Sequence, residues 1–352
     1  MRTTAIDLFC GIGGLSYGLK QAGISVVAGI DLDDTCQYAY EENVEAEFLH
    51  RDITKVKGDE LEAYFDQDNA DVKILAGCAP CQPFSSHTNK DKDKEKRDDW
   101  NLINEFKRLI VETKPTIVTM ENVPNLAKKQ IFKDFVAFLE ENDYFVSYSN
   151  VFAPDYGIPQ KRRRLVLLAS KYGVINLIPP THTPENYVTL RDAIGGLPPV
   201  KAGEISSVDP LHRSINLREI NIKRIQASKP NGTWEDWDDE LKLACHKKKT
   251  GGTYKAVYGR MSWDEPSSTI TTQFHNYGTG RFGHPVQDRA LTLREGALLQ
   301  TFPQEYKFFE DESKIFIRKF GVHIGNAVPV DLGVVIGKSI QAHIGEHNGS
   351  EE

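Results

Sequence analysis

The chain has 352 residues, of which 39 % are hydrophobic and 26 % charged, the composition of a globular protein with one large or two ordinary domains. No apolar run reaches the roughly 20 residues that span a bilayer, so no membrane partner is expected. The first 14 residues lack the features of a signal peptide, so we expect a cytoplasmic location. These properties argue against secreted and membrane-spanning classes.

The net charge and the cysteine count further limit the kinds of protein that the sequence can encode. Five cysteines are an odd number in a chain without a secretion signal, which predicts free thiols. The formal net charge of −7 argues against unspecific coating of a polyanion. Residues 179–290, however, carry 15 Lys and Arg against 13 Asp and Glu, whereas the remainder carries 28 against 37. The middle of the chain is therefore the better candidate to contact an anion.

The first 175 residues alternate apolar runs with helical patterns. Strands are predicted at 5–9, 25–31, 47–52, 73–77, 115–120 and 164–169, and helices at 15–22, 35–43, 101–113 and 131–142. This rhythm predicts a doubly wound α/β sheet of parallel strands with helices on both faces. Ligands of such sheets bind beyond the carboxyl ends of the strands.

The rhythm breaks near residue 179, where Pro, Thr, Gly and His become frequent. We predict a first domain over 1–178 and a smaller, irregular, partly β domain over 179–290. Residues 291–345, with helices at 293–300 and after the Gly/Pro turn near 325, are expected to return to the first domain. Residues 346–352 are expected to form a flexible tail.

A glycine-rich turn, Asp7-Leu8-Phe9-Cys10-Gly11-Ile12-Gly13-Gly14, follows the first strand. Glycines let the backbone approach a ligand closely and adopt positive φ. Asp31 ends the second strand, where doubly wound folds place the acid that bonds ribose hydroxyls. Asp52 follows the third strand and could reach an adenine amino group. The spacing fits an adenosine ligand without pyrophosphate better than NAD; a tight turn with surface acids is the alternative.

A stiff cysteine loop follows the fourth strand, with the sequence Gly77-Cys78-Ala79-Pro80-Cys81-Gln82-Pro83-Phe84-Ser85. Its Cys-x-x-Cys is open to several interpretations: a zinc site, a redox pair, a single nucleophile at Cys81, or two buried structural thiols. Zinc would need two more ligands, and no second Cys pair exists, so no metal is predicted. A redox pair would leave the adenosine site unexplained.

Two further motifs fall at the same edge of the predicted sheet. Glu121-Asn122-Val123 ends the fifth strand, where an enclosed acid can hold a proton near neutral pH. The run Gln160-Lys161-Arg162-Arg163-Arg164 leads into an apolar strand. Period-two alternation puts Arg162 and Arg164 on one face, toward a site, and the other two basic residues toward solvent or phosphate. A loop acid and a solvated basic run are the alternatives.

The order of these motifs resembles the DNA (cytosine-5) methyltransferase family of the bacterial restriction-modification type. The glycine-rich turn resembles its cofactor motif, Pro80-Cys81-Gln82 its catalytic motif, Glu121-Asn122-Val123 its glutamate motif, and Gln160-x-Arg162-x-Arg164 its basic motif. Similar matches run in family order to about residue 335: Thr269-Ile270-Thr271-Thr272, Leu293-Arg294-Glu295, Gln300-Thr301-Phe302-Pro303 and Gly325-Asn326-Ala327-Val328-Pro329. Two residues depart from the family pattern, because Asp31 stands where Glu is commoner and Leu32 where an aromatic often stacks.

The resemblance implies a Rossmann-like S-adenosyl-L-methionine-dependent methyltransferase domain, with residues 179–290 as the target-recognition domain. It implies methyl transfer to carbon 5 of a flipped-out cytosine in a specific duplex sequence, through an adduct of Cys81 with carbon 6, leaving S-adenosyl-L-homocysteine. Glu121 would bond N3 and the exocyclic amine, and Arg164, supported by Arg162, would bond O2.

The implied site residues form three sets. The catalytic residues are Cys81, Glu121, Arg162 and Arg164. The cofactor contacts are Phe9, Gly11, Gly13, Gly14, Asp31, Leu32, Asp52, Ile53, Pro80, Leu102, Asn326 and Val328. The DNA contacts are Gln82, Ser85, Arg163, Arg260, Thr271, His275, Tyr277 and Arg281, with the lysines at 247–249.

The expected partner is double-stranded DNA, with a cognate restriction endonuclease acting separately from a monomeric, nucleoid-associated enzyme. Three other interpretations stay open. A related branch of the same fold methylates tRNA, but its recognition region is reduced and the residues after its Pro-Cys differ. A nucleotide-binding Cys-x-x-Cys oxidoreductase would give Glu121 and Arg164 no role. A catalytically silent DNA-binding relative would not need the four catalytic residues.

Overall fold

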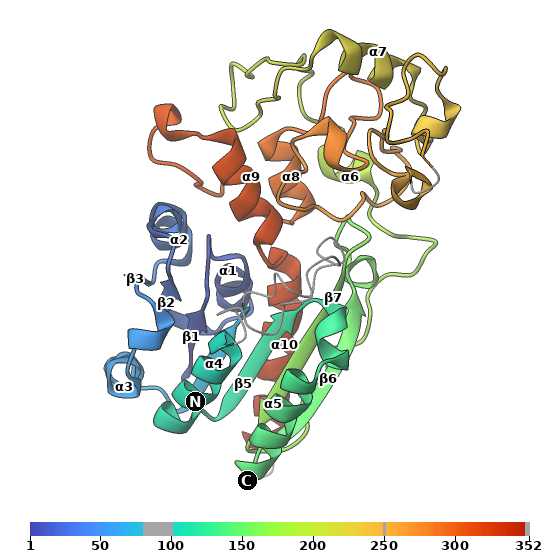
Figure 1. The fold of residues 1–352 in the computed structure, drawn as a ribbon. Helices are drawn as coiled ribbons and strands as arrows, with labels where there is room; N and C mark the ends of the chain where they lie inside the picture. The colour runs from blue at the N-terminus through green and yellow to red at the C-terminus, as the bar shows by residue number, and fades with distance from the viewer. Residues whose placement is uncertain (80–100, 249–250, 349–352) are drawn as a thin grey trace. The chain divides into compact units, whose positions relative to one another are not determined.

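The computed structural model describes residues 1–79, 101–248 and 251–348 (Figure 1). The chain forms two compact units. Unit 1 comprises Met1–Tyr156, Arg163–Thr181 and Val328–Glu352, and unit 2 comprises Gly157–Arg162 and His182–Ala327. Residues 291–327 therefore belong to unit 2, whereas the sequence led us to expect that the return to the first domain begins at 291.

Unit 1 is built on a seven-stranded sheet of order β3-β2-β1-β4-β5-β7-β6. The strands are β1 (Thr3–Leu8), β2 (Ser25–Asp31), β3 (Glu47–His50), β4 (Val72–Gly77), β5 (Ile117–Asn122), β6 (Phe145–Phe152) and β7 (Arg163–Ser170). The first five run parallel, whereas β7 runs antiparallel to both β5 and β6. The expectation of a wholly parallel sheet was wrong for β7, which runs against the other six strands.

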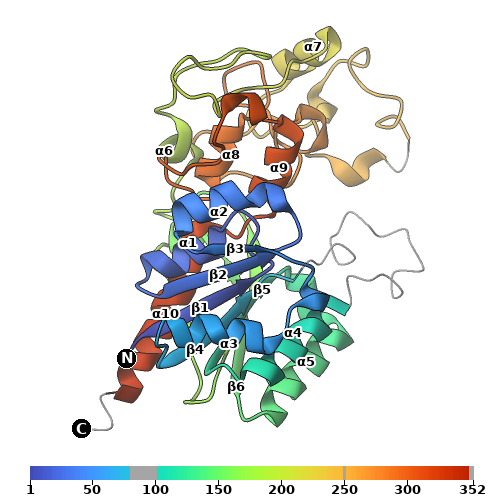
Figure 2. The same cartoon turned by 90° about the vertical axis from the view of Figure 1, so that its left-hand side faces the viewer.

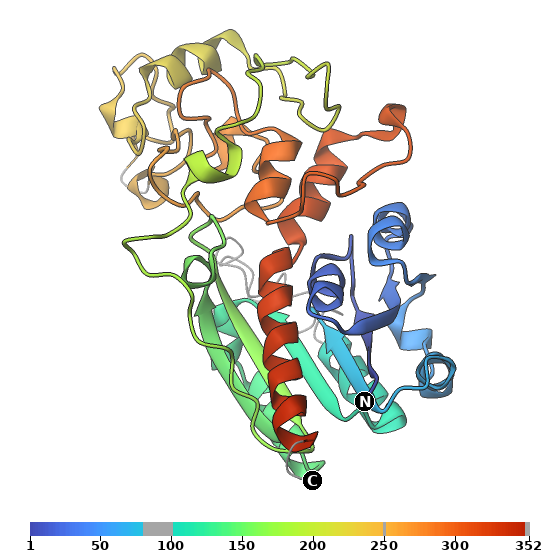
Figure 3. The same ribbon diagram turned by 180° about the vertical axis from the view of Figure 1, so that it is seen from behind.

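Helices cover both faces of this sheet, which confirms the expected doubly wound α/β architecture (Figures 2 and 3). One face carries α3 (Gly58–Gln67), α4 (Asn101–Thr113) and α5 (Gln130–Glu141). Their apolar sides pack on alternate strand residues such as Leu8, Leu75, Met120 and Leu167 in one buried cluster.

The opposite face carries α1 (Gly14–Gln21), α2 (Gln37–Val44) and α10 (Val330–Asn348). Helices α1 and α10 approach each other closely, because a Cβ added at Gly18 would lie 2.4 Å from the carbonyl oxygen of Val330. Glycine is therefore required there, and the C-terminal helix is held against the helix that begins at the glycine-rich turn.

Unit 2 is irregular, as its composition predicts. Its helices are α6 (Leu190–Ile194), α7 (Glu219–Ala227), α8 (Leu293–Leu299) and α9 (Ile317–Asn326). In the described part of this unit, β structure is limited to isolated bridges such as Arg260↔Gly283. Loops dominate, so the unit needs side chains to satisfy buried backbone groups.

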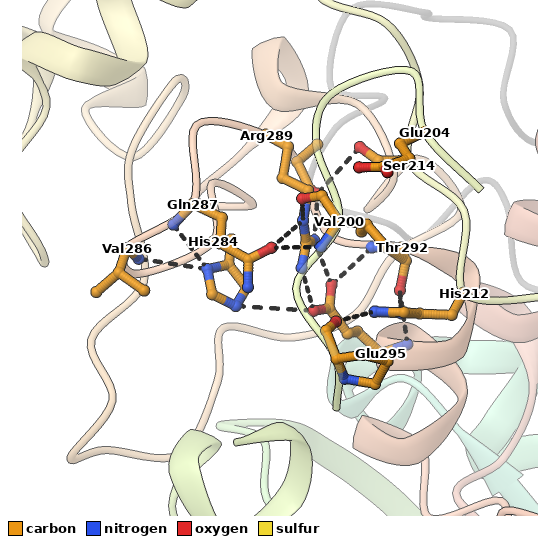
Figure 4. Close-up of polar contacts among 12 residues, drawn as sticks. Val200, Glu204, His212, Ser214, His284, Val286, Gln287, Arg289, Thr292 and Glu295 are labelled. Carbon is orange, nitrogen blue, oxygen red and sulfur yellow. Dashed lines mark hydrogen bonds and ion pairs between the residues drawn. The ribbon is translucent and has the colours of Figure 1, made fainter. Parts of the chain in front are cut away.

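A buried ion pair bonds some of these backbone groups (Figure 4). Both guanidinium Nη atoms of Arg289 bond the carboxylate of Glu295 at 2.7–2.8 Å, and both side chains are 1 % exposed. Arg289 also donates to the carbonyl oxygen of Val200, and Glu295 accepts from the backbone N–H of Thr292 at the start of α8. The pair therefore joins the segment around Val200 to residues 289–295 at the start of α8.

One helical stretch, Ile317–His347, is long and apolar enough to cross a membrane, with a mean hydropathy of 1.4 in its most apolar part. That part is 72 % buried inside the protein. Core helices of soluble proteins pass the same test, so this is weak evidence for a membrane span.

Candidate active site

The glycine-rich turn opens a binding surface at the carboxyl end of β1. Phe9, Gly11 and Gly13 all have positive φ, at 64°, 50° and 86°, and Gly13 caps the α1 helix that begins at Gly14. A Cβ added at Gly11 would meet no atom within 4 Å, so the loop faces open space there. The backbone at this point is available to a ligand.

Asp31 is fixed beside this turn at the end of β2. One carboxylate oxygen accepts from the backbone N–H of Gly11 at 2.8 Å, and the other accepts from that of Asp33 at 2.9 Å. A carboxylate oxygen can accept more than one hydrogen bond, so Asp31 keeps acceptor capacity for the hydroxyls of a ligand. Its position also orients the glycine-rich turn.

The next strand end supplies an apolar surface and a second acid. Leu32 is 68 % exposed although it directly follows Asp31. Asp52 caps the short helix at Ile53–Lys55, and its hydrogen bonds with the hydroxyl and backbone N–H of Thr54 lower the pKa of the carboxyl. Because β3 pairs with β2, both acids lie at neighbouring strand ends.

The remaining expected cofactor contacts are distributed unevenly. Ile53 and Val328 are buried, whereas Leu102 and Phe9 are partly buried against the sheet's core cluster. Asn326 is exposed at the end of α9 in unit 2. Pro80 lies outside the described residues.

A buried acid that the sequence analysis left without a role lies under the turn. Asp7 is 1 % exposed, and burial, with a contribution from the charge of Asp31, raises its pKa to about 7, although the hydroxyl of Ser16 donates to it at 2.6 Å. Only its place in the motif, directly before the apolar strand end, could have drawn attention to it.

Glu121 and Arg164 meet at the next part of the same sheet edge. Glu121 lies on β5 and is buried, and its Oε1 is 2.7 Å from Nε of Arg164 on the neighbouring β7. The thiol of Cys78, which follows β4, donates to Oε2 of Glu121 at 3.0 Å. Three adjacent strands therefore converge on one carboxylate.

Asn122 fixes the chain that leads into the cysteine loop. Its side-chain amide donates to the carbonyl oxygen of Ala79 at 3.1 Å, and its oxygen accepts from the backbone N–H of Val123. Asn122 belongs to the Glu121-Asn122-Val123 motif, from which no role was predicted for it. The expected nucleophile Cys81 and the expected DNA contacts Gln82 and Ser85 lie outside the described residues.

Arg162 belongs to unit 2, whereas Arg164 belongs to unit 1. Arg162 is 2 % exposed and donates to the carbonyl oxygens of Ile270 at 2.9 Å and Ala327 at 3.4 Å. Gln160 likewise accepts from the backbone N–H of Ile270 and donates to Gln300. Gln160 and Arg162 of the basic motif therefore bond backbone groups of unit 2. The alternation of side chains along a strand could not predict these contacts.

The structure does not support three of the expected DNA contacts, because their polar atoms are buried. Arg260 is 5 % exposed, donates to three backbone carbonyls at 2.8–2.9 Å and pairs with Asp288. Tyr277 is fully buried with its hydroxyl 2.9 Å from Ser228, and burial raises its pKa to about 12. His275 is 7 % exposed, and burial lowers its pKa.

The other expected DNA contacts among the described residues are at least partly exposed to solvent. Arg163 is exposed and stacks on the ring of Phe152, 4.2 Å from its centroid. Thr271 and Arg281 are partly exposed, and the lysines at 247 and 248 are exposed. Lys249 lies outside the described residues.

Comparisons with known proteins agree with this geometry. The C-5 cytosine-specific DNA methylase family matches residues 3–342. The Type II methylase M.HgiDII of Herpetosiphon aurantiacus is 52 % identical over 339 residues, covering 96 % of this chain and 94 % of the relative. The Type II methyltransferase M.Eco47II of Escherichia coli is 30 % identical, covering 96 % of this chain and 78 % of the relative.

Two solved structures share the fold. A structure described as a prophage-encoded DNA modification methyltransferase from E. coli superposes with a TM-score of 0.73 at 20 % identity, covering 97 % of this chain and 99 % of that one. The Dnmt2 methyltransferase of S. pombe gives a TM-score of 0.62 at 19 % identity, covering 99 % of this chain and 100 % of that one.

Proposed function

Because the chain belongs to the C-5 cytosine-specific DNA methylase family and is a DNA cytosine-5 methyltransferase of the restriction-modification kind, we propose that it acts through a covalent adduct of Cys81. The observation that carries the proposal is the convergence of Glu121, Arg164 and the stem of the cysteine loop on one sheet edge. The reaction needs no metal.

Enzymes of this family use S-adenosyl-L-methionine, and the first half of the edge fits that molecule. Asp31 has acceptor capacity for the ribose hydroxyls, and the exposed Leu32 offers an apolar surface to adenine. Asp52 follows the neighbouring strand, as an acceptor for the adenine amino group. The open space at Gly11 would admit the rest of the molecule. When bound, it supplies an electrophilic methyl group.

The second half of the edge fits a cytosine. Carbon 5 of cytosine is a poor nucleophile, and addition of the Cys81 thiolate to carbon 6 makes the ring enamine-like. Glu121 would bond N3 and the exocyclic amine, stabilising the charge that develops during addition. Arg164 would bond O2 and help to ionise the thiol. Carbon 5 could then take the methyl group, which would leave S-adenosyl-L-homocysteine. Loss of the carbon 5 proton to solvent and elimination of the Cys81 thiolate would restore the aromatic ring.

The substrate of this chemistry is proposed to be double-stranded DNA, with the target base flipped out of the helix at a cost of a few kcal/mol. The Type II names of the relatives, at up to 52 % identity, favour DNA over tRNA. We propose a monomeric cytoplasmic enzyme that acts separately from a cognate endonuclease.

Replacing Cys81 tests the covalent step. The Cys81→Ser variant should lose methyl transfer while it still binds DNA and S-adenosyl-L-homocysteine. Wild-type enzyme should form a denaturation-resistant complex with DNA that carries 5-fluorocytosine, because fluorine cannot leave carbon 5 as a proton does. The exposed Cys245 gives a matched control, since Cys245→Ser should keep both properties. Turnover by Cys81→Ser would remove Cys81 as the nucleophile.

A further inference from the structure

A polar cleft of about 370 Å³ lies within unit 2. It is lined by Lys161 of the basic motif and by residues of the expected target-recognition region, among them Asn231, Glu265, Ser268 and Arg281. The proposed chemistry uses none of these side chains.

Its charged groups form a connected chain. Nη1 of Arg281 donates to Oδ1 of Asn231 at 3.3 Å, and Nδ2 of Asn231 donates to Oε1 of Glu265 at 2.9 Å. The other oxygen of Glu265 forms an ion pair with Nζ of Lys161. A guanidinium and a carboxylate thus flank one amide and are held in fixed positions.

Arg281 keeps donors for a ligand. Its hydrogen bond among the described residues is the one to Asn231, so most of its five N–H donors are not used by that part of the chain. Its aliphatic stem packs against Gly259, where an added Cβ would lie 3.1 Å from Cγ of Arg281. Burial lowers the pKa of Arg281, because few waters solvate the charge. Arg260 is the contrast, since its guanidinium is engaged by four acceptors.

The carboxylate decides what kind of group the cleft suits. A phosphate would meet the negative charge of Glu265, which argues against an anion. A G·C base pair instead presents two acceptors, O6 and N7 of guanine, beside the N4 amino donor of cytosine. A bidentate arginine next to a carboxylate acceptor complements that edge. Both groups are partly exposed, since the side chain of Glu265 is 45 % exposed and Arg281 is half-buried.

We propose that this cleft reads one G·C base pair of the target sequence, with Arg281 donating to guanine and Glu265 accepting from cytosine. Asn231 and Lys161 act as positioning residues for these two side chains. The inference rests on the proposed function, because it assigns the sequence-reading contact of a DNA methyltransferase.

The test compares sequence preference with salt dependence. Wild type, Arg281→Gln, Arg281→Lys and Glu265→Gln are offered a library of duplexes randomised around a cytosine, and the methylated products are read by bisulfite sequencing. Binding of one preferred duplex is then measured at several salt concentrations. Arg191→Gln is the control, since Arg191 is an exposed arginine of the same unit paired with Asp264.

The account predicts that Arg281→Gln relaxes preference at one G·C position by about 10- to 100-fold and leaves the salt slope unchanged. Glu265→Gln should relax the same position, and Arg191→Gln none. A uniform loss of affinity for all sequences, with the salt slope reduced by about 1, would assign Arg281 to a phosphate and overturn the inference.

Unchanged preference in a folded Arg281→Gln protein would also overturn it, and S-adenosyl-L-homocysteine binding and thermal melting report the folding. If Arg281→Gln does not fold, Arg281→Lys carries the test, because it keeps the charge and loses the bidentate fork. Absence of DNA methylation by the wild type would instead refute the proposed function, so the two failures are distinguishable.

Discussion

Oε1 of Glu121 lies 2.7 Å from Nε of Arg164, across the antiparallel pair formed by β5 and β7. The antiparallel direction of β7 matters, because it brings the first residues of that strand to the carboxyl end of β5. A parallel strand would have placed Arg164 at the opposite edge of the sheet. The antiparallel direction of β7 therefore brings Arg164 beside Glu121.

The hydrogen bond from Cys78 should hold the Glu121 carboxylate in its working orientation. Cys78→Ala removes a bond to a charged group, worth about 1.5 kcal/mol, and should lower kcat about tenfold with little change in the KM for S-adenosyl-L-methionine. Cys78→Ser should restore most of the rate, since a hydroxyl can donate in the same place. Steady-state methyl transfer checks both, and equal rates for alanine and serine would contradict a positioning role.

Asp31 should contribute to cofactor affinity in two ways, as a ligand acceptor and through Gly11. We expect Asp31→Ala to weaken S-adenosyl-L-homocysteine binding about 10- to 100-fold, the range for lost hydrogen bonds to a charged group. Titration calorimetry measures this directly. The exposed neighbour Asp34 supplies the control, and an Asp31→Ala affinity equal to that of Asp34→Ala would refute the ribose assignment.

Much of unit 1 could be predicted from sequence because its strands are buried on both faces. Four strands, β1, β2, β4 and β5, are apolar runs followed by motifs that contain Gly, Asp, Cys and Glu. The same pattern therefore predicted both the strands and the site residues at their ends. The edge strand β6 was missed, because its sequence FVSYSNVF is largely exposed or half-buried and lacks an apolar run.

The residues of unit 2 could not be assigned in the same way. A loop arginine carries no periodicity that tells a buried side chain from an exposed one. Arg260 and Arg281 therefore looked alike in sequence, although one is engaged by backbone carbonyls and the other faces a cleft. The buried pair Arg289–Glu295 was missed as an ion pair for the same reason.

His284 should make unit 2 sensitive to acid. Burial lowers its pKa to about 4, against an opposing effect of Glu295, so the imidazole is neutral in the fold and accepts two backbone N–H bonds at Nδ1. Its contribution is present above about pH 6.5 and is lost as the pH falls toward 4. Between pH 7 and 5 this group should cost about 2 kcal/mol of unfolding free energy.

Denaturant titrations at pH 7 and pH 5, followed by tryptophan fluorescence, measure that loss, because Trp234, Trp237 and Trp263 belong to unit 2. His284→Gln should show a smaller difference between the two pH values than wild type does. The exposed His50 gives the control variant His50→Gln. An identical pH dependence for all three proteins would show that His284 is not the titrating group.

The buried pair Arg289–Glu295 should be costly to break from one side. Glu295→Gln leaves a buried guanidinium without its counter-charge, so we expect a loss of about 3–5 kcal/mol in unfolding free energy. Glu310→Gln, at an exposed pair with Lys314, should cost less than about 1 kcal/mol. Replacing both buried partners by Met and Leu should recover part of the loss, and equal costs for the two single variants would contradict this assignment.

Methylation of DNA at carbon 5 of cytosine is best tested by methyl transfer from labelled S-adenosyl-L-methionine, with unmethylated genomic DNA and bulk tRNA offered in parallel. The DNA product would be mapped by bisulfite sequencing. We expect label in DNA alone, at carbon 5 of cytosine within one short motif. Label in tRNA alone, or none in either substrate while the cofactor still binds, would contradict this expectation.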